Sequence, residues 1–380
     1  MKVAFIHNEK KIGTGAHYIN DLMSSKLKGM GVEIKNFYPR TSFDAPMHLS
    51  GLKNILFFHS LIEKRNEILK FDLIQGTTYT PLPFLAYPIP VISHFGSTTN
   101  GFLNTTPLAS QLEDGPRDVW YGLKKAKVIK ELNIRTRRPL RDIAEIEELV
   151  AIKADAIIAT SVNVKNELIA IGVDEEKIHM IHNAIEDYWF DNSNTKIVDE
   201  PQIVFLGRIG NDAFNLKLKG LDRLIHLYNQ FKDVKKTTIC MTTNKGVVSW
   251  LMDNIPNHSL FVNMKKDRIP ETVKNLRGSI LFLSSRYEGF SLSLIEGMSQ
   301  GLVPVAYPVG VAPEIIRNGE NGFLVSSQSE AVEKIKILLA NPELRKKCVI
   351  EAEKTARNFS GSEITKKLIK LYEKIGRKRQ

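Results

Sequence analysis

The sequence contains few cysteines: only Cys240 and Cys348 occur in 380 residues. These two lie far apart in the chain and show none of the short Cys and His spacings that hold zinc. Disulfide frameworks belong mainly to oxidising compartments and need more cysteine than this. We therefore expect two free thiols in a protein of the reducing cytoplasm.

Long apolar runs are also absent. The first residues, MKVAFIHNEKK, hold only four apolar residues in succession, too few for a signal peptide. The most apolar-looking stretch, residues 81–92, contains four prolines and is too short to span a bilayer. We expect a cytoplasmic protein that does not cross a membrane.

Charge is unevenly distributed along the chain. The formal net charge is +11 with a pI near 9.4, of which residues 1–190 carry about +1 and the rest about +10. Basic runs interleaved with aromatic residues are missing, so we expect no nucleic-acid partner. The densest basic segment, Arg117 to Arg141, has nine basic and two acidic residues. It indicates either peripheral contact with anionic lipid on the inner face of a membrane or a solvated helix face.

Apolar stretches recur along the whole chain and predict an α/β fold. Many end in polar or glycine-containing turns and lead into helical patterns, the order of a parallel sheet with crossover helices. The length allows two or three domains. The expected strands are 2–7, 32–37, 72–75, 91–94, 154–161, 177–183, 203–206, 238–241, 260–262, 280–283 and 303–307.

Residues 280–325 hold the most informative motif. Glu288 and Glu296 follow the predicted strand 280–283, with seven residues between them, and a short helix leads to the next strand. Open α/β sheets bind ligands at the carboxyl ends of their strands, which is where Glu288 would lie. The amides of residues 289–293 would start the helix and offer donors to an anion. Two carboxylates for hydroxyl groups beside an amide nest are what a nucleotide sugar requires.

A structural interpretation of the same residues is available. Ser293 and Glu296 have the spacing of a capping box, in which the glutamate only closes the helix start. Glu288 could be a solvated loop residue. In isolation, two glutamates at this spacing favour that interpretation.

The order of the surrounding elements favours a site. The segment S-x-x-E-G-F at residues 285–290, Glu296, the sequence GLVPV at 301–305 and GVAPEI at 310–315 resemble one family signature. It is the signature of retaining, nucleotide-sugar-dependent glycosyltransferases of the GT-B fold, family 4-like or group 1. The last piece has one residue more than the usual spacing. The resemblance implies two Rossmann-like domains that face each other across a cleft.

Several further residues match the family pattern. Gly207-Arg208 and Lys219-Gly220 resemble its G-R and K-G pairs, whose cations hold the donor diphosphate. His94 ends a predicted strand, where family members commonly carry a histidine near the reacting sugar. In HNAIEDYWF, at residues 182–190, Ala184 replaces the usual glycine of N-G-V-D.

The resemblance implies a set of site residues and no metal. The residues expected at the reaction centre are His94, Arg208, Lys219 and Glu288. The donor would also contact Gly15 of the 13–15 glycine turn, Asn263 at the base, and Gly289, Phe290, Ser291, Leu292 and Glu296. The chain lacks the Asp-x-Asp pair of metal-dependent glycosyltransferases. We therefore expect neither a metal nor another cofactor.

The resemblance also divides the chain. Residues 1–191 would form the acceptor-side domain, with 107–138 among its helices, 192–200 the linker and 201–360 the nucleotide-sugar domain. Residues 361–380 would form a helix that returns to the first domain. The implied reaction moves a sugar from a UDP-, GDP- or ADP-sugar to a glycan, a lipid or another cell-envelope acceptor, with retention. A nucleotide-sugar epimerase and a non-catalytic membrane-surface binding protein are the alternatives.

Overall fold

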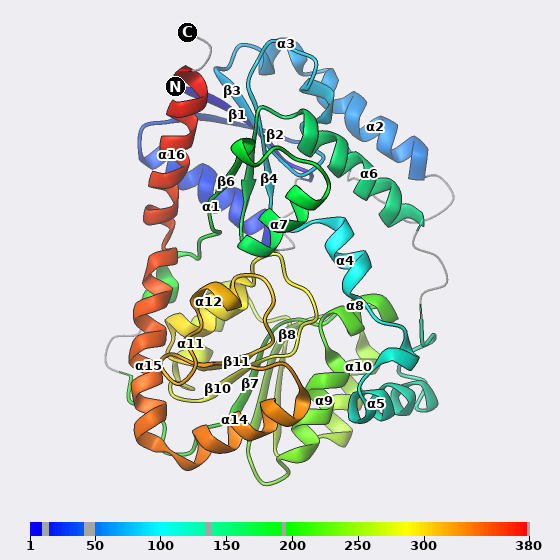
Figure 1. Cartoon of the computed structure of the whole chain (residues 1–380), viewed down its shortest axis with the longest axis vertical. Coiled ribbons are helices and arrows are strands. Elements are labelled where there is room, and N and C mark those ends of the chain that lie inside the picture. Colours follow the sequence, from blue (N-terminus) through cyan, green and yellow to red (C-terminus); the bar gives the residue numbers. More distant parts are fainter. Residues whose placement is uncertain (10–14, 42–49, 134–137, 192–194, 378–380) are drawn as a thin grey trace. The chain divides into compact units, whose positions relative to one another are not determined.

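A computed structural model describes residues 1–9, 15–41, 50–133, 138–191 and 195–377 (Figure 1). The chain divides into two compact units. The first unit consists of Met1–Leu103, Arg137–Glu186 and Phe359–Gln380, and the second of Asn104–Thr136 and Asp187–Asn358.

The first unit is built on a six-stranded sheet in the order β2-β1-β3-β4-β5-β6, in which every neighbouring pair is parallel. Its central strands are apolar on both faces because helices cover both sides of such a sheet. The strands are β1 (Lys2–Ile6), β2 (Glu33–Phe37), β3 (Leu73–Thr77), β4 (Val91–Phe95), β5 (Ala156–Ala159) and β6 (Ile178–Met180).

Helices connect these strands, and the last helix of the chain joins them. In α16 (Gly361–Arg377), Ile364, Leu368, Leu371 and Ile375 are buried, and the helix contacts α1 (Gly15–Gly29). Its Tyr372 hydroxyl donates to Gln75 Oε1 of β3 at 2.6 Å. The other helices of this unit are α2 (Ser50–Ile62), α3 (Arg65–Ile68), α4 (Thr99–Thr105), α6 (Arg138–Lys153) and α7 (Val162–Ala170), of which α4 ends in the second unit.

The second unit repeats this plan with a six-stranded sheet in the order β12-β11-β10-β7-β8-β9, again parallel between neighbours. The α/β class with two parallel sheets is as predicted. The strands are β7 (Ile203–Arg208), β8 (Lys236–Met241), β9 (His258–Val262), β10 (Ile280–Leu283), β11 (Val303–Ala306) and β12 (Phe323–Leu324).

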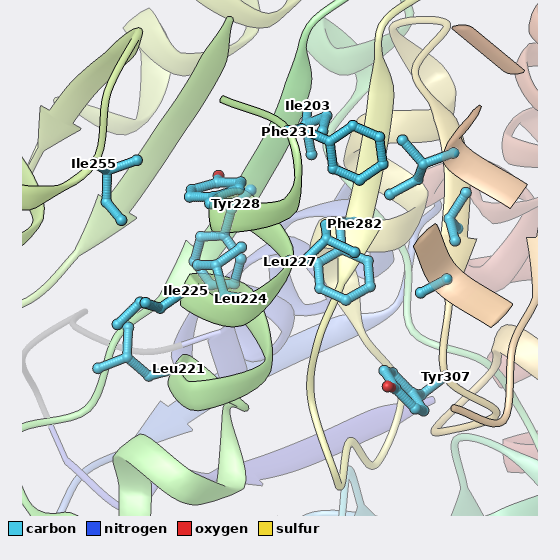
Figure 2. Close-up of a cluster of buried hydrophobic side chains, with 14 of the residues drawn as sticks. Ile203, Leu221, Leu224, Ile225, Leu227, Tyr228, Phe231, Ile255, Phe282 and Tyr307 are labelled. Atoms are coloured by element: carbon cyan, nitrogen blue, oxygen red, sulfur yellow. The ribbon is translucent and has the colours of Figure 1, made fainter. Parts of the chain in front are cut away.

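A cluster of buried apolar side chains packs between this sheet and its helices (Figure 2). Helix α9 (Leu221–Gln230) contributes Leu221, Leu224, Ile225, Leu227 and Tyr228, each 2% exposed or less. The other helices of the unit are α5 (Asp114–Lys125), α8 (Ala213–Leu218), α10 (Lys245–Asn254), α11 (Ile269–Lys274), α12 (Leu292–Ser299), α13 (Ala312–Ile315), α14 (Gln328–Ala340) and α15 (Pro342–Ala356).

Residues 104–133, which we call the arm, belong to the second unit although strands of the first unit precede and follow them. Helix α5 of the arm packs against α9, and buried Trp120 and Leu123 join the core of the second unit. This differs from the expectation that 107–138 lie with the acceptor-side domain. The sequence does not reveal it because the contacts that hold the arm, such as Arg223 with Glu113, join residues 110 positions apart.

Candidate functional site

The carboxyl ends of β7, β10 and β11 bring three loops together in the second unit. The strands are adjacent and parallel, so the loops that follow them emerge at one edge of the sheet. The first loop leads from Arg208 through α8 to Gly220, the second covers 284–291, and the third covers 307–311.

Glu288 lies at the centre of these loops. Its Oε1 accepts hydrogen bonds from Lys219 Nζ and from Ser285 Oγ, both at 2.7 Å. The side chains of Lys219 and Glu288 are 27% and 15% exposed, so the ion pair is partly open to solvent. Glu288 Oε2 has no hydrogen-bond partner among the described residues. The structure thus joins two predicted site residues 69 positions apart.

The main chain beside Lys219 is held by the loop that carries Glu288. The carbonyl oxygens of residues 217, 218 and 219 accept from Arg286 Nη1 at 2.8 Å, from the Arg286 amide at 2.8 Å and from Ser284 Oγ at 2.9 Å. Arg286 also forms a bidentate pair with Asp222 at 2.7 and 2.6 Å. These bonds fix the Lys219 backbone relative to Glu288.

Two glycines permit the close approach of these loops. Gly220 has φ +65°, and a Cβ there would lie 2.0 Å from the carbonyl oxygen of Ser284. Gly310 has φ +56°, and a Cβ there would lie 2.5 Å from the Phe290 oxygen. Only glycine meets both the backbone angle and the lack of space.

Helix α12 begins next to Glu288. The helix spans Leu292–Ser299, so Ser293 lies inside it, and its N-cap residue Ser291, with φ +82°, makes no side-chain capping hydrogen bond. The capping-box alternative for Ser293 and Glu296 is therefore wrong. Ser291 Oγ is buried and has no hydrogen-bond partner among the described residues. A buried hydroxyl at an uncapped helix start is suited to an anionic ligand.

The remaining predicted donor residues are distributed around this helix. Gly289 and Phe290 are buried in the loop before it, Leu292 is its half-buried first residue, and half-buried Glu296 lies in its second turn. Gly207 lies beside it, because a Cβ there would come within 3.8 Å of Ser293 Oγ. Arg208 follows at the end of β7, exposed and without a polar partner among the described residues.

Asn263 follows β9 at the same edge of the sheet, with φ +54°. Its side chain bonds to Thr242 in both directions: Oδ1 accepts from the Thr242 amide at 2.9 Å and Nδ2 donates to the Thr242 carbonyl at 2.8 Å. The side chain thus joins the loops after β8 and β9. Its contact with a base remains a prediction.

Two predicted site residues belong to the first unit. His94 lies in β4, paired in register with Thr77 and Ile158. Burial lowers the pKa of His94 to about 4, against the effect of a hydrogen bond with Asn183, so the imidazole is neutral at neutral pH. Gly15 is the first residue of α1, while residues 10–14 of its turn lie outside the described ranges.

Neither a metal cluster nor a membrane span is found in the described ranges. No three His, Cys, Asp or Glu residues among them are grouped so that they could hold a metal ion. None of the helices described there is long and apolar enough to cross a bilayer.

Two parallel α/β units, one of them with an ion pair and an uncapped helix at its strand ends, define the class of GT-B glycosyltransferases. Two family models match the chain in succession: "Glycosyltransferase Family 4" over residues 24–187 and "Glycosyl transferases group 1" over residues 189–355. The chain belongs to these GT-B, family 4-like glycosyltransferases, as the resemblance implied.

Individual relatives agree with this membership. The chain is 28% identical over 246 residues to the uncharacterised glycosyltransferase MJ1069 of Methanocaldococcus jannaschii, covering 60% of both chains. It is 21% identical over 271 residues to α-maltose-1-phosphate synthase of Mycolicibacterium smegmatis, covering 60% of this chain and 66% of that one. The matches thus span less than two thirds of the length of these relatives.

Solved structures show the same fold. Sucrose-phosphate synthase from Thermosynechococcus elongatus matches with a TM-score of 0.73 at 14% identity, covering 98% of both chains. Anabaena Alr3699/HepE, in complex with UDP and glucose, matches with a TM-score of 0.63 at 16% identity, covering 98% of this chain and 100% of that one. At such identities the likeness is one of fold.

Sequence reasoning missed several residues of this arrangement. The family motif includes Ser285 but does not predict its hydrogen bond to Glu288, and no motif points to Asp222 or Arg286. Asp222 and Arg286 lie 64 positions apart, so no local spacing could pair them. In the sequence, Asp222 stands two residues after Gly220 and Arg286 two residues before Glu288, and this closeness to the motifs is the only indication of their role.

Proposed function

We propose that this chain transfers a sugar from a nucleoside-diphosphate sugar to an acceptor hydroxyl, with retained configuration and without a metal. The observation that supports this most strongly is the convergence of Lys219 and Ser285 on Glu288 beside the uncapped start of α12. It combines a cation, a free carboxylate oxygen and backbone donors within one set of loops.

The chemistry of the leaving group fits these charges. Negative charge builds on the diphosphate as the glycosidic bond breaks, so a cation fixed there stabilises the transition state more than the ground state. Lys219 uses one of its three N–H donors on Glu288, which leaves two for phosphate oxygens. Arg208, exposed and without a polar partner among the described residues, can form a bidentate contact with a second phosphate.

We assign sugar recognition to the carboxylates. Glu288 Oε2 can accept from a sugar hydroxyl while Oε1 keeps its two bonds. Glu296, in the second turn of the helix, is assigned to the ribose, and Asn263 to the base. Neutral His94 of the first unit, which we assign to the acceptor side, can donate to or accept from a hydroxyl.

A donor screen tests the proposed function. UDP, GDP, ADP and their sugars are added to the full chain, and melting is followed. A ligand at about 100 times its dissociation constant stabilises the protein by roughly 2.7 kcal/mol. One donor family should raise the melting temperature, and that donor should release its nucleoside diphosphate when acceptors are supplied. Stabilisation by none of them would contradict the assignment.

The same assay separates the alternatives and the metal requirement. Incubation of the donor alone should leave its sugar unchanged, whereas an epimerase would convert it. A non-catalytic binding protein would release no nucleoside diphosphate from any donor. Because cations of the chain are proposed to hold the diphosphate, turnover should change by less than about twofold in excess EDTA. Loss of turnover that manganese or magnesium restores would contradict the metal-free site.

A further inference from the structure

The loop that carries Lys219 is held from two directions. On one side, Arg286 and Ser284 bond to three successive carbonyls, those of residues 217, 218 and 219. On the other, the Lys217 side chain, 1% exposed, donates to the Pro107 carbonyl at 3.0 Å and to Asn133 Oδ1 at 2.6 Å in the arm. Lys217 and Lys219 thus extend to different partners from one short segment.

Arg286 is the residue that connects these contacts. Its guanidinium bonds to the Lys217 carbonyl and to both oxygens of Asp222, whose side chain is 0% exposed. Its amide bonds to the Leu218 carbonyl, and its own chain reaches Glu288 two residues later. The fork of an arginine suits this geometry because it can serve a carboxylate and a carbonyl at once.

We propose that Arg286 is a positioning residue: with Asp222 and Ser284 it sets the backbone of Lys219 so that the ammonium meets Glu288 and faces the donor diphosphate. The part of this inference that concerns the diphosphate rests on the proposed function, whereas the placement of Lys219 on Glu288 does not. We assign Arg286 an action through Lys219 because its guanidinium is occupied by Asp222 and the Lys217 carbonyl and its side chain is only 7% exposed.

The chain offers a matched control for a purely stabilising role. Arg277 pairs with Glu353 through Nε at 2.6 Å and Nη2 at 3.1 Å, and its Nη1 donates to the Thr195 carbonyl at 3.1 Å. This pair has the same chemistry in the same unit, but it links the loop before β10 to α15. Arg277→Lys and Arg286→Lys both keep the charge and lose the fork.

Chemical labelling of lysines measures the placement without any substrate. The full chain is pulsed with an amine-acylating reagent, and modification of Lys219 is read by peptide mass spectrometry. Arg286→Lys should raise the rate at Lys219 by roughly two- to fivefold, the range of a partly exposed ion pair, while Arg277→Lys leaves it unchanged. Ser284→Ala, which removes one bond to the Lys219 carbonyl, should give a smaller rise and serves if Arg286→Lys does not fold.

Turnover with the stabilising donor supplies the second measurement. Arg286→Lys should lower kcat by on the order of tenfold to a hundredfold, because a small misplacement of a catalytic group is costly. When Lys219→Ala is already present, adding Arg286→Lys should lower kcat little further, because Arg286 is proposed to act only by positioning the Lys219 side chain. Arg277→Lys should leave kcat near wild type.

The outcomes separate the two claims. Altered Lys219 labelling in a protein that turns over no donor would leave the placement standing and contradict the proposed function. Equal labelling in wild type and in both Arg286→Lys and Ser284→Ala would overturn the positioning role. So would fully additive losses in the Lys219→Ala background.

Discussion

Two lysines that are two positions apart differ completely in their surroundings. Lys217 is buried under the arm with its ammonium 5.5 Å from the Trp120 ring centre, whereas Lys219 is partly exposed and pairs with Glu288. The motif K-x-K-G does not indicate which lysine faces the ligand. The family resemblance selected Lys219, and the ion pair with Glu288 agrees with that selection.

The charge of Lys219 should matter most as the leaving group forms. Removing one preorganised contact of this kind typically costs about 3 kcal/mol, or on the order of a hundredfold in rate. Lys219→Ala should lower kcat by that factor and keep a cooperative melting curve. Wild-type turnover would mean that the anion is held elsewhere. At position 208, Arg208→Lys should retain more turnover than Arg208→Ala but not all of it, because a point charge cannot replace a bidentate fork.

Glu147 of α6 gives a pH-dependent prediction in the first unit. Burial raises its pKa to about 7, although its Oε2 accepts from the Thr99 amide at 2.8 Å. The folded state then holds a proton that the unfolded state has released, so stability falls as pH rises from about 4.5 to about 7. Glu147→Gln keeps an acceptor for Thr99 and removes the charge. The unfolding free energy of Glu147→Gln minus that of wild type should therefore increase by on the order of 2–3 kcal/mol from pH 5 to pH 8.

Unfolding free energies at both pH values measure this gain. The lowered pKa of His94 acts in the opposite direction, as its stabilising effect is lost when pH falls from about 6.5 to about 4. Comparing the variant with wild type at each pH cancels the effect of His94. A difference between the two proteins that does not change with pH would contradict the assignment to Glu147.

Among the elements, the positions of the strands could be predicted from the sequence, whereas the contacts between the loops that follow them could not. All eleven predicted strands are present, because buried parallel strands are near-continuous apolar runs. The strand that was missed, β12, has only two residues, Phe323 and Leu324, too few to form a pattern. Sequence patterns gave the positions of β7, β10 and α12, but not the pairing of the loops after them.

The arm shows why helices of this kind are hard to assign. Helix α5 buries Trp120 and Leu123, as expected for any amphipathic helix. The sequence around α5 does not indicate which of the two sheets these side chains cover. The decisive contacts are Lys217 with Pro107 and Asn133, and Arg223 with Glu113. They lie between 84 and 110 positions apart in the chain.

Lys217→Met should therefore loosen the arm. The change keeps an unbranched apolar side chain but removes the buried ammonium that donates to the Pro107 carbonyl and to Asn133 Oδ1, at a cost of roughly 1–3 kcal/mol. Limited proteolysis should cut within the arm, residues 104–133, faster than in wild type. Lys236→Met is the control, because Lys236 is equally buried and donates to the carbonyls of Lys232 and Pro256. It should lower stability without exposing the arm; equal cleavage in both variants would contradict the anchoring role.

At the scale of the whole molecule, the net charge is shared almost equally between the two folded units, unlike the uneven split between residues 1–190 and the rest of the sequence. With the arm assigned to it, the second unit has 29 Lys and Arg against 23 Asp and Glu, and the first has 24 against 19. The units thus carry +6 and +5, in place of the +10 and +1 of the two sequence segments. Because the two units carry nearly equal net charges, a charge excess on one unit does not favour either of them for membrane contact, and a local basic cluster is the feature to test.

The local cluster is the basic end of the arm. Lys124, Lys125, Lys127 and Lys130 are all exposed there, and Lys124 donates to the Lys130 carbonyl. Arg135 and Arg137 of the same segment lie outside the described residues, and the side chain of Arg138 is not described. Basic residues near an anionic surface contribute about 1 kcal/mol each. Peripheral contact through Arg117–Arg141 remains a prediction, and its strength can be estimated from the exposed lysines.

Sedimentation with anionic vesicles tests it. A triple variant with Lys125→Gln, Lys127→Gln and Lys130→Gln leaves Lys124 unchanged and should bind vesicles on the order of a hundredfold more weakly. The wild-type protein should be released as the salt concentration rises. The control changes three exposed lysines of α15, Lys346, Lys347 and Lys354, to Gln and so removes the same charge from the same unit. It should sediment like wild type if the arm makes the contact. Equal losses in both triple variants would mean that net charge alone acts, and no binding by wild type would mean that the basic end of the arm is a solvated surface.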